Sequence, residues 1–309
     1  SLRNMMAEVL HVFWSTVYAS GVLLFLQFAL PPLIRAISSM RKKTAESKAG
    51  AEGLDKQEQE NLLEKKWIKD TVYLYQMPGT KNLPSVSPYC LKIETFLRLH
   101  KINYERRYLM VGRGANGKLP FVELNGEHFS DSEIILRRLV HHFKIQEYAD
   151  PKDADVGHAI TVLADRHIYN IFLHYKVSHN PENLLKGMLG GIVPDFIVTM
   201  LVKPIVAPFV RMKIHNRLAD AIGSFTDEEY RELTRKDLET LQRMLGDKKF
   251  LFGDKMTTAD CAVFGHLGAM LYLGQHSHPN FLLLSHQFAP LREYVHRVRD
   301  VLFGSKFCM

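Results

Sequence analysis

The sequence predicts a mixed α/β lobe followed by an all-α lobe, with one transmembrane helix in front of both. Three observations carry this prediction: an uncharged apolar run near the start, short strand-like segments between residues 71 and 130, and only helical periodicity beyond about residue 150. A chain of 309 residues, 46% of them hydrophobic, can build a full core for such a body. The expected parts are a membrane anchor (1–40), a charged tether (41–70), the α/β lobe (71–149) and the helical lobe (150–309).

The first element is an apolar run from Val9 to Ile34 that contains no Asp, Glu, Lys or Arg. About 20 such residues span a bilayer as a helix, whereas a cleaved signal peptide has an apolar region of roughly 7 to 15 residues. We therefore expect an uncleaved anchor. Basic residues crowd its trailing side, beginning with Arg35 and Arg41, so the positive-inside rule predicts a single-pass membrane protein whose main body is cytosolic.

Charge and cysteine content exclude several other classes of protein. The net charge is +7, but the clearest basic cluster lies beside the apolar run, where anionic lipid is the simpler partner, so no nucleic acid is expected. Cys90, Cys261 and Cys308 form no C-x-x-C pair, which fits a reducing compartment without structural zinc. His141 and His142 lack a third ligand at helical spacing, and we expect no metal site.

The α/β lobe begins with a β-branched and aromatic run, residues 71–77, which predicts a buried strand. Ser87 and Pro88 then predict the N-cap and the first residue of a helix. A second strand is expected near residues 104–111. The helix between these two strands makes the connection long enough for the strands to pair in parallel.

The helix that begins at Pro88 has one apolar face. Cys90, Ile93 and Leu97 follow three- and four-residue spacing, so this face is expected to be buried. Lys92 and Glu94 take other faces of the helix. Cys90 is therefore expected to be a buried small hydrophobe rather than a nucleophile.

A hairpin and a second helix complete this lobe. Residues 118–126 predict a strand that ends in a turn, and 127–129 its return strand. Ser130 and Glu133 have the spacing of a capping box, which would open the next helix. The order β-α-β followed by β-β-α is the thioredoxin-like layout.

The second lobe shows helical periodicity alone, over residues 159–174, 227–245 and 260–272. Thr257 and Asp260 have the spacing of a variant capping box at the start of the last of these helices. Gly265 and Gly268 on that helix would let neighbouring elements approach closely.

Several of these motifs together resemble the glutathione transferase fold: Ser87 to Cys90, Leu119-Pro120, Asp131-Ser132 and Phe252 to Asp260. More narrowly, LPSVSPYCLKIETFLR and LGDKKFLFGDKMTTADCAVFGHL resemble two signatures of the failed axon connections family, which is related to nematode cadmium-responsive proteins and similar to the metaxins. The resemblance covers roughly residues 71–299.

The resemblance implies glutathione as a co-substrate, with Ser87 as the catalytic residue. Leu119, Pro120, Asp131 and Ser132 would bind the peptide, Pro120 through a cis bond that leaves the Leu119 backbone free to pair with it. A helix N-terminus suits the γ-glutamyl carboxylate, so Ser132 would bind this group and Asp131 the ammonium. Capping alone is the alternative role for both residues.

Ser87 has two alternative roles as well. It could donate a hydrogen bond to the glutathione thiol and lower its pKa, or it could only cap its helix, which is worth about 1 kcal/mol. A hydroxyl cannot replace a cysteine in disulfide exchange, so glutaredoxin-type reduction at this position is excluded. Tyr75 and Ser85 are further candidates for activating the thiol.

The sequence therefore leaves two alternative functions, one of an enzyme and one of a non-catalytic protein. The first is a membrane-anchored glutathione transferase-like protein that conjugates glutathione to electrophiles in detoxification or stress response. The second is a non-catalytic scaffold of the same fold, acting in axon development or membrane-associated protein interaction. A homodimer or another protein partner is compatible with either function, and fold alone does not separate them.

Overall fold

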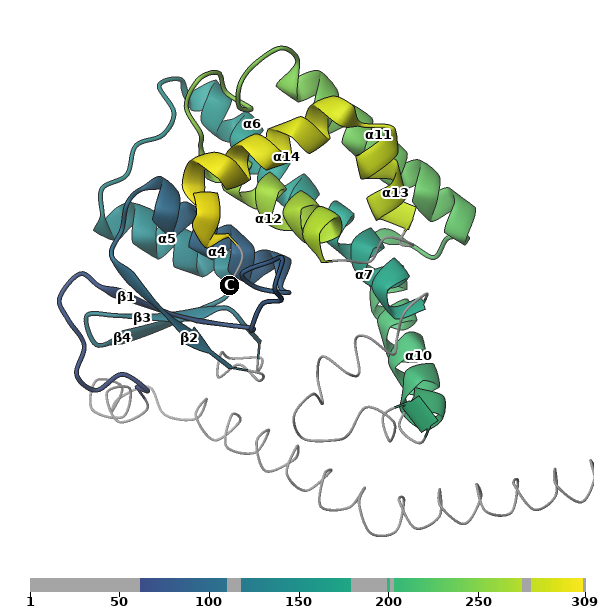
Figure 1. The fold of residues 1–309 in the computed structure, drawn as a ribbon, viewed down its shortest axis with the longest axis horizontal. Coiled ribbons are helices and arrows are strands. Elements are labelled where there is room, and N and C mark those ends of the chain that lie inside the picture. The colour runs from purple at the N-terminus through teal and green to yellow at the C-terminus, as the bar shows by residue number, and fades with distance from the viewer. Residues whose placement is uncertain (1–61, 110–117, 179–198, 201–202, 274–278, 308–309) are drawn as a thin grey trace, which may run out of the picture.

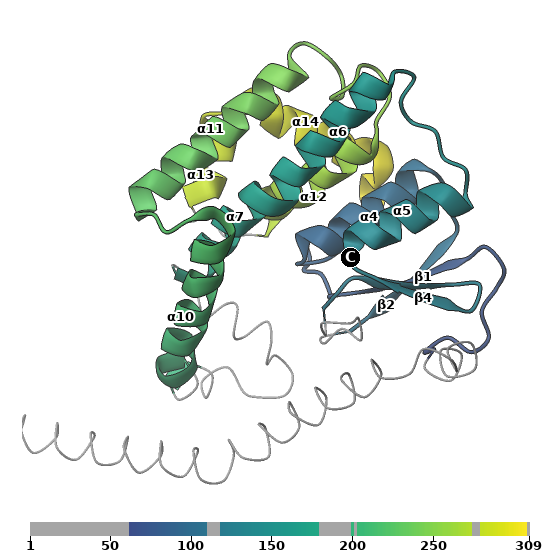
Figure 2. The same ribbon diagram turned by 180° about the vertical axis from the view of Figure 1, so that it is seen from behind.

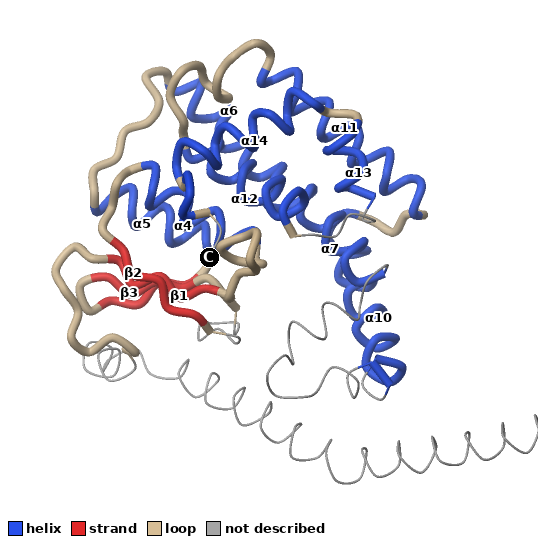
Figure 3. Tube along the Cα trace, viewed as in Figure 1, coloured by secondary structure: helices blue, strands red, loops and turns tan. Residues whose placement is uncertain are grey.

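The computed structural model describes residues 62–109, 118–178, 199–200, 203–273 and 279–307. Within these residues the chain forms a sheet lobe and a helical lobe that lie side by side (Figure 1). Of the described residues, those of the sheet lobe come first, and all the strands among them belong to this lobe (Figure 3). This arrangement confirms the predicted α/β lobe followed by a helical lobe.

The sheet has four strands in the order β2-β1-β3-β4. β1 and β2 are parallel, and the remaining neighbours are antiparallel. The expected parallel crossover and hairpin are therefore both present. The strands are β1 (Val72–Gln76), β2 (Tyr104–Tyr108), β3 (Phe121–Leu124) and β4 (Glu127–Ser130).

Two helices, α4 (Pro88–Leu99) and α5 (Ser132–His142), cover one face of the sheet (Figure 2). Val72 and Leu74 of β1 point into this layer and pack with Ile93 and Phe96 of α4. Because side chains alternate along a strand, Tyr73 and Tyr75 lie on the opposite face.

Residues 62–70 lie against that opposite face, although the sequence placed them in the charged tether. Glu123 of β3, only 2% exposed, accepts hydrogen bonds from the backbone N–H groups of Leu63 (2.9 Å) and Glu64 (2.8 Å). Asp70 N–H donates to Asn125 Oδ1 at 2.7 Å. These bonds hold the segment to the sheet, and we call it the strap.

The helical lobe begins with α6 (Pro151–Val162), the π-helical segment η2 (Leu163–Ile168) and α7 (Tyr169–Ser178), which follow one another without a break. The expected helices over 159–174, 227–245 and 260–272 are confirmed. The other elements are α10 (Lys203–Ile222), α11 (Asp227–Leu245), α12 (Thr258–Tyr272), α13 (Pro279–His286), α14 (Ala289–Leu302) and the short η4 (Gly304–Lys306).

α12 is the central helix, buried along nearly its whole length and packed against α4. Thr257 N–H donates to Asp260 Oδ2 at 2.8 Å, so the predicted capping pair is present. A Cβ on Gly265 would lie 2.7 Å from the Pro88 carbonyl oxygen. The expected close approach at this glycine therefore joins α12 directly to the beginning of α4.

The predicted capping box at Ser130 is wrong. Ser130 is the last residue of β4, where it pairs with Phe121, so its backbone belongs to the ladder. Asp131 is the N-cap instead: its side chain accepts from Glu133 N–H at 3.0 Å, and its φ of 75° turns the chain into α5.

The predicted transmembrane helix and single-pass membrane localisation require a correction. No helix of the described residues is long and apolar enough to cross a membrane, and Val9 to Ile34 lie outside those residues. α12 is apolar but has 15 residues where a span needs about 20, and the longer α10 and α11 carry charges along their length. The structure therefore does not support a single-pass membrane protein.

Candidate functional site

The expected site residues come together at one edge of the sheet. Phe121 pairs with Tyr75 of β1 on one side and with Ser130 of β4 on the other. Pro120 comes directly before Phe121 in the chain, and Asp131 comes directly after Ser130. Because Phe121 and Ser130 are paired, Leu119-Pro120 and Asp131-Ser132 are neighbours in space. The loop after β1 returns to the same edge, since Ser85 Oγ donates to the Met77 carbonyl at 2.8 Å. This loop leads into Ser87.

Ser87 is the N-cap of α4, as predicted. Its backbone is extended, with φ of −96° and ψ of 120°, and its Oγ accepts from Cys90 N–H at 3.4 Å. In this bond the hydroxyl is the acceptor, so its proton remains available for donation to the Cys90 thiol or to another group. The side chain is half-buried. Capping and donation to a thiol are therefore compatible at this residue.

Cys90 is a buried, unreactive thiol. It is fully buried, and burial raises its pKa to about 11, although the Ser87 hydroxyl opposes this shift. The thiol is therefore neutral near pH 7, and the thiolate is the nucleophilic form. Cys261 is buried as well. Cys90 thus matches the expectation of a buried small hydrophobe, and Cys308 lies outside the described residues.

Tyr75 and Ser85 are engaged in other contacts. Tyr75 OH donates to Glu123 Oε2 at 3.0 Å, and its ring stacks on Phe121 with centroids 4.4 Å apart. This places Tyr75 on the sheet face opposite α4, and burial raises its pKa. Ser85 is fully buried. Of the three candidate hydroxyls, only Ser87 is both partly exposed and at the helix start.

The other two motifs have unusual backbone geometry. The Leu119–Pro120 peptide bond is cis, as expected. Asp131 is a non-glycine residue at positive φ, a conformation that clusters at functional sites. Ser132 is the first residue of α5 and is buried, and its hydroxyl has no partner among the contacts of the described residues. The start of α5 thus presents a free hydroxyl beside free backbone N–H groups.

A buried charge cluster joins the lobes beneath this site, and sequence reasoning missed it. Lys92 of α4 contacts Asp165 of η2 at 2.5 Å (Nζ to Oδ2), and His266 Nε2 of α12 lies 2.8 Å from Asp165 Oδ1. Lys92 and His266 are at most 1% exposed. The spacing of Lys92 had indicated a face away from the core, but α12 covers that face. No local signal in the sequence reveals this contact.

The protonation of this cluster follows from its surroundings. Burial lowers the pKa of His266, so the imidazole is neutral and donates from Nε2 to Asp165. Burial of Asp165 acts to raise its pKa, but the His266 hydrogen bond and the Lys92 charge hold it below the usual range. The cluster is therefore an ion pair between Lys92 and Asp165, supported by a neutral histidine.

Tyr89 connects this cluster to the helix start. Its hydroxyl donates to the Asp165 main-chain carbonyl at 2.6 Å. Its ring lies 4.6 Å from the Tyr169 ring and 5.2 Å from the His266 ring. Because Tyr89 is two residues from Ser87, the buried cluster holds the surroundings of Ser87 in place.

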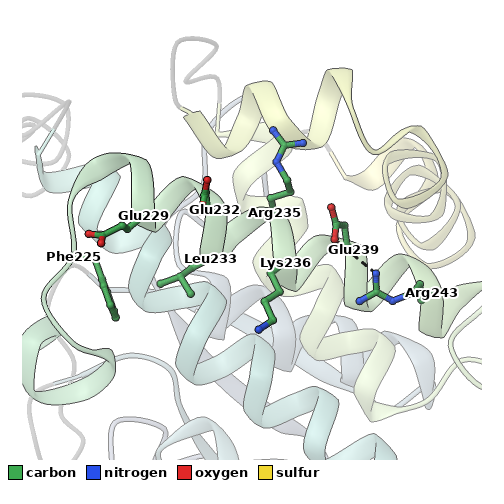
Figure 4. A pocket seen from close by; sticks show the side chains of 8 residues that line it. All are labelled: Phe225, Glu229, Glu232, Leu233, Arg235, Lys236, Glu239 and Arg243. Carbon is green, nitrogen blue, oxygen red and sulfur yellow. Dashed lines mark ion pairs between the residues drawn. The ribbon is translucent and has the colours of Figure 1, made fainter.

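A surface hollow of about 640 Å³ lies elsewhere, along α11 (Figure 4). Its side chains are mostly charged, and Glu239 and Arg243 pair with each other at 3.7 Å. None of the expected site residues lines it. The hollow is formed by α11 and the loop before it, and it is separate from the candidate site.

Comparison with known proteins agrees with this geometry. Residues 88–183 match the family described as "Glutathione S-transferase N-terminal domain", and residues 234–298 match "Glutathione S-transferase, C-terminal domain". The fold and these two matches define a glutathione transferase-like protein.

Three curated relatives refine this assignment. "Failed axon connections" of Drosophila melanogaster is 34% identical over 79% of this chain and 60% of its own length. "Isoprene-epoxide--glutathione S-transferase" of Rhodococcus sp. (strain AD45) is 25% identical over 64% of this chain and 84% of its own length. "Metaxin-1 homolog" of Drosophila melanogaster is 22% identical over 67% of this chain and 65% of its own length. The chain belongs to the failed axon connections family of glutathione transferase-like proteins.

Proposed function

We propose that this chain binds glutathione at the sheet edge and conjugates it to an electrophile. The observation that carries the proposal is the convergence of the Ser87 helix start, the Leu119–Pro120 bond and the Asp131-Ser132 turn on that edge. The match to glutathione transferase families over both lobes supports it, as does the Rhodococcus relative, which is named as a transferase.

Each group has a part of the peptide to bind. The γ-glutamyl carboxylate would lie at the beginning of α5, where the helix dipole and the free Ser132 hydroxyl favour an anion. Asp131 would bind the ammonium of the same residue. The backbone of Leu119 would pair with the cysteinyl amide. The thiol would then lie near Ser87.

In the reaction, the glutathione sulfur forms a bond to an electrophilic carbon, and the leaving group departs with its electron pair or an epoxide ring opens. The thiol proton goes to solvent. The Ser87 hydroxyl would donate to the sulfur and, with the dipole of α4, lower a thiol pKa that begins near about 8.5. The thiolate fraction at pH 7 would rise accordingly.

The test combines binding with turnover. Titration calorimetry would measure glutathione binding, and an absorbance assay would follow conjugation of 1-chloro-2,4-dinitrobenzene. We expect Ser87→Ala to bind glutathione about as well as the wild type and to lose roughly 10- to 1,000-fold in turnover. Absence of binding at millimolar glutathione would contradict the proposal.

Thr226→Ala is the matched control. Thr226 caps α11, where its Oγ accepts from Glu229 N–H at 3.3 Å, so this change removes a helix cap far from the sheet edge. Both variants lose about 1 kcal/mol of capping. If Thr226→Ala loses as much turnover as Ser87→Ala, then Ser87 acts through stability alone.

A non-catalytic scaffold is the second candidate. Its support is the 34% identical Drosophila relative, whose name refers to axon connections rather than to a reaction. The cap bond at Ser87 also gives this hydroxyl a purely structural role. Glutathione binding without turnover in the wild type would favour the scaffold.

A further inference from the structure

Strand β2 is the outermost strand on one side of the sheet, and among the residues that the structure describes no strand lies beyond it. At one end of β2 the Asn103 carbonyl accepts from Val72 N–H at 2.9 Å. At the other end Leu109 N–H donates to the Gln76 carbonyl at 3.0 Å. Backbone groups alternate in direction along a strand, so every second residue between Asn103 and Leu109 also faces β1. The backbone groups of the intervening residues face the outer side of β2: Tyr104, Arg106 and Tyr108.

The sequence of β2, Tyr-Glu-Arg-Arg-Tyr, complements itself when a second copy runs in the opposite direction. In an antiparallel pair centred on Arg106, Tyr104 lies opposite the partner's Tyr108. Glu105 lies opposite the partner's Arg107. The outward backbone groups then meet residue by residue, because Tyr104 and Tyr108 are each two residues from the centre. A shift by one residue would set outward-facing groups against inward-facing ones, so this register pairs the whole strand.

Opposite charges meet on the face of this pair that carries the strap. Glu105 and Arg107 lie on that face, where Arg107 contacts Glu105 at 2.7 Å and Glu64 at 3.2 Å within one chain. Charged side chains protect an edge strand from pairing when like charges come together. In this register each Glu105 instead gains an arginine from the partner. The charges of this face therefore favour a second copy of the strand.

The opposite face of the pair carries the tyrosines and Arg106. Tyr104 packs against the core beneath α4, and Arg106 and Tyr108 lie on the same face because side chains alternate along a strand. Tyr108 is 42% exposed, so its ring offers contact area to the partner's Tyr104. The two Arg106 side chains repel each other at the centre. The buried Glu94 carboxylate, whose Oε1 lies 3.9 Å from Arg106 Nη1, offsets part of this repulsion.

We propose that two copies of this chain pair through their β2 strands, antiparallel and centred on Arg106, so that the two four-stranded sheets become one. The pair has twofold symmetry, and each strand supplies half of a self-complementary interface. No residue of β2 belongs to the candidate glutathione site. The inference is therefore independent of the proposed function, and neither fails with the other.

The oligomeric state of the full chain tests the pairing. Sedimentation velocity at about 1 to 300 µM protein covers the range of weak interfaces. We expect a dissociation constant of about 1 to 100 µM, because one short strand pair buries less area than a standard interface. A chain that stays monomeric throughout this range would overturn the inference.

Charge exchange tests the register. Glu105→Arg alone sets two arginines against each other, and Arg107→Glu alone sets two glutamates against each other, in both halves of the pair. Each variant should weaken pairing about 3- to 30-fold. An equimolar mixture of the two variants restores opposite charges at both positions, so it should pair more tightly than either variant alone. Glu239→Arg makes the same charge change on α11 and should leave the dissociation constant unchanged.

Proline at the centre tests the backbone contact. The Arg106 amide faces outward, so Arg106→Pro removes a donor of the pair but no hydrogen bond to β1, and urea unfolding checks that the fold is kept. It should weaken pairing by more than about 10-fold. Arg106→Ala keeps the amide and removes the repulsion, so it should pair at least as tightly as the wild type. A dimer that survives Arg106→Pro, or a mixture no tighter than the two charge variants alone, would overturn the inference.

Discussion

Replacing Asp165 with Asn would test the buried charge cluster between the lobes. The carboxylate is the shared acceptor for Lys92 Nζ at 2.5 Å and His266 Nε2 at 2.8 Å. Without its charge, the fully buried Lys92 ammonium has no anionic partner among the described residues, and the Tyr89 ring, 5.8 Å away, does not replace one. Breaking a buried pair from one side costs about 3 to 5 kcal/mol, out of a typical stability of about 5 to 15 kcal/mol.

Urea unfolding at pH 7, followed by far-ultraviolet circular dichroism, measures this loss. Urea carries no charge, so it leaves the ion pair unscreened. With a slope of about 2 to 3 kcal/mol per molar, the midpoint of Asp165→Asn should fall by about 1 to 2 M. The slope itself should stay unchanged, because the same surface is exposed on unfolding.

Two further variants separate charge burial from other effects. The double change Lys92→Met with Asp165→Asn removes both charges and keeps an acceptor for His266, so it should recover much of the lost stability. Asp300→Asn breaks an exposed pair with Arg299 and should cost less than about 1 kcal/mol. A loss of under about 1 kcal/mol in Asp165→Asn, or a double variant no more stable than it, would refute the reasoning.

Two other predictions concern the strap and the contact between the lobes. Burial of Glu123 acts to raise its pKa, but its hydrogen bonds hold this pKa below the usual value. The stabilisation by the carboxylate is therefore present above the pKa of the unfolded state and is lost as pH falls through the pKa of the folded state. Glu123→Gln should cost about 1 to 3 kcal/mol of stability at pH 7, and this difference should close in acid. Amide exchange in residues 62–70, measured by mass spectrometry, should become faster in this variant. Unchanged exchange would contradict the role of Glu123 in holding the strap. Gly265→Ala should cost about 1 to 3 kcal/mol in urea unfolding, because its Cβ would lie 2.7 Å from the backbone of Pro88. Gly268→Ala should be tolerated, since the nearest contact of its Cβ would be a side-chain atom at 3.5 Å. Equal losses of stability in the two variants would argue against a clash at Gly265.

Local patterns in the sequence were sufficient for most of the fold. The strand that begins at Val72 and the helix that begins at Pro88 were predictable because β-branched runs, caps and apolar spacing act over a few residues. The capping residue before α5 was not. Ser130 and Asp131 both suit a helix start, and the pairing of Ser130 with β3 decided between them.

The candidate site was predictable in part and for a different reason. The motifs around Ser87, Pro120 and Asp131 were recognised by resemblance, but their spatial relation depends on strand register. Tyr75 was a further candidate for activating the thiol. Its partner, Glu123, is 48 residues away in the chain, so no local pattern could show that its hydroxyl is already engaged.

The sequence by itself determined the order of strands and helices and the Ser87 helix start, because these depend on contacts between near neighbours in the chain. It also determined the family, through its motifs. Tertiary structure alone decided that Lys92 is buried against Asp165 and His266, and that the Tyr89 ring meets the rings of Tyr169 and His266. Those residues come from separate helices in both lobes. A helical pattern shows which faces are apolar, but only packing shows which polar face a neighbouring helix covers.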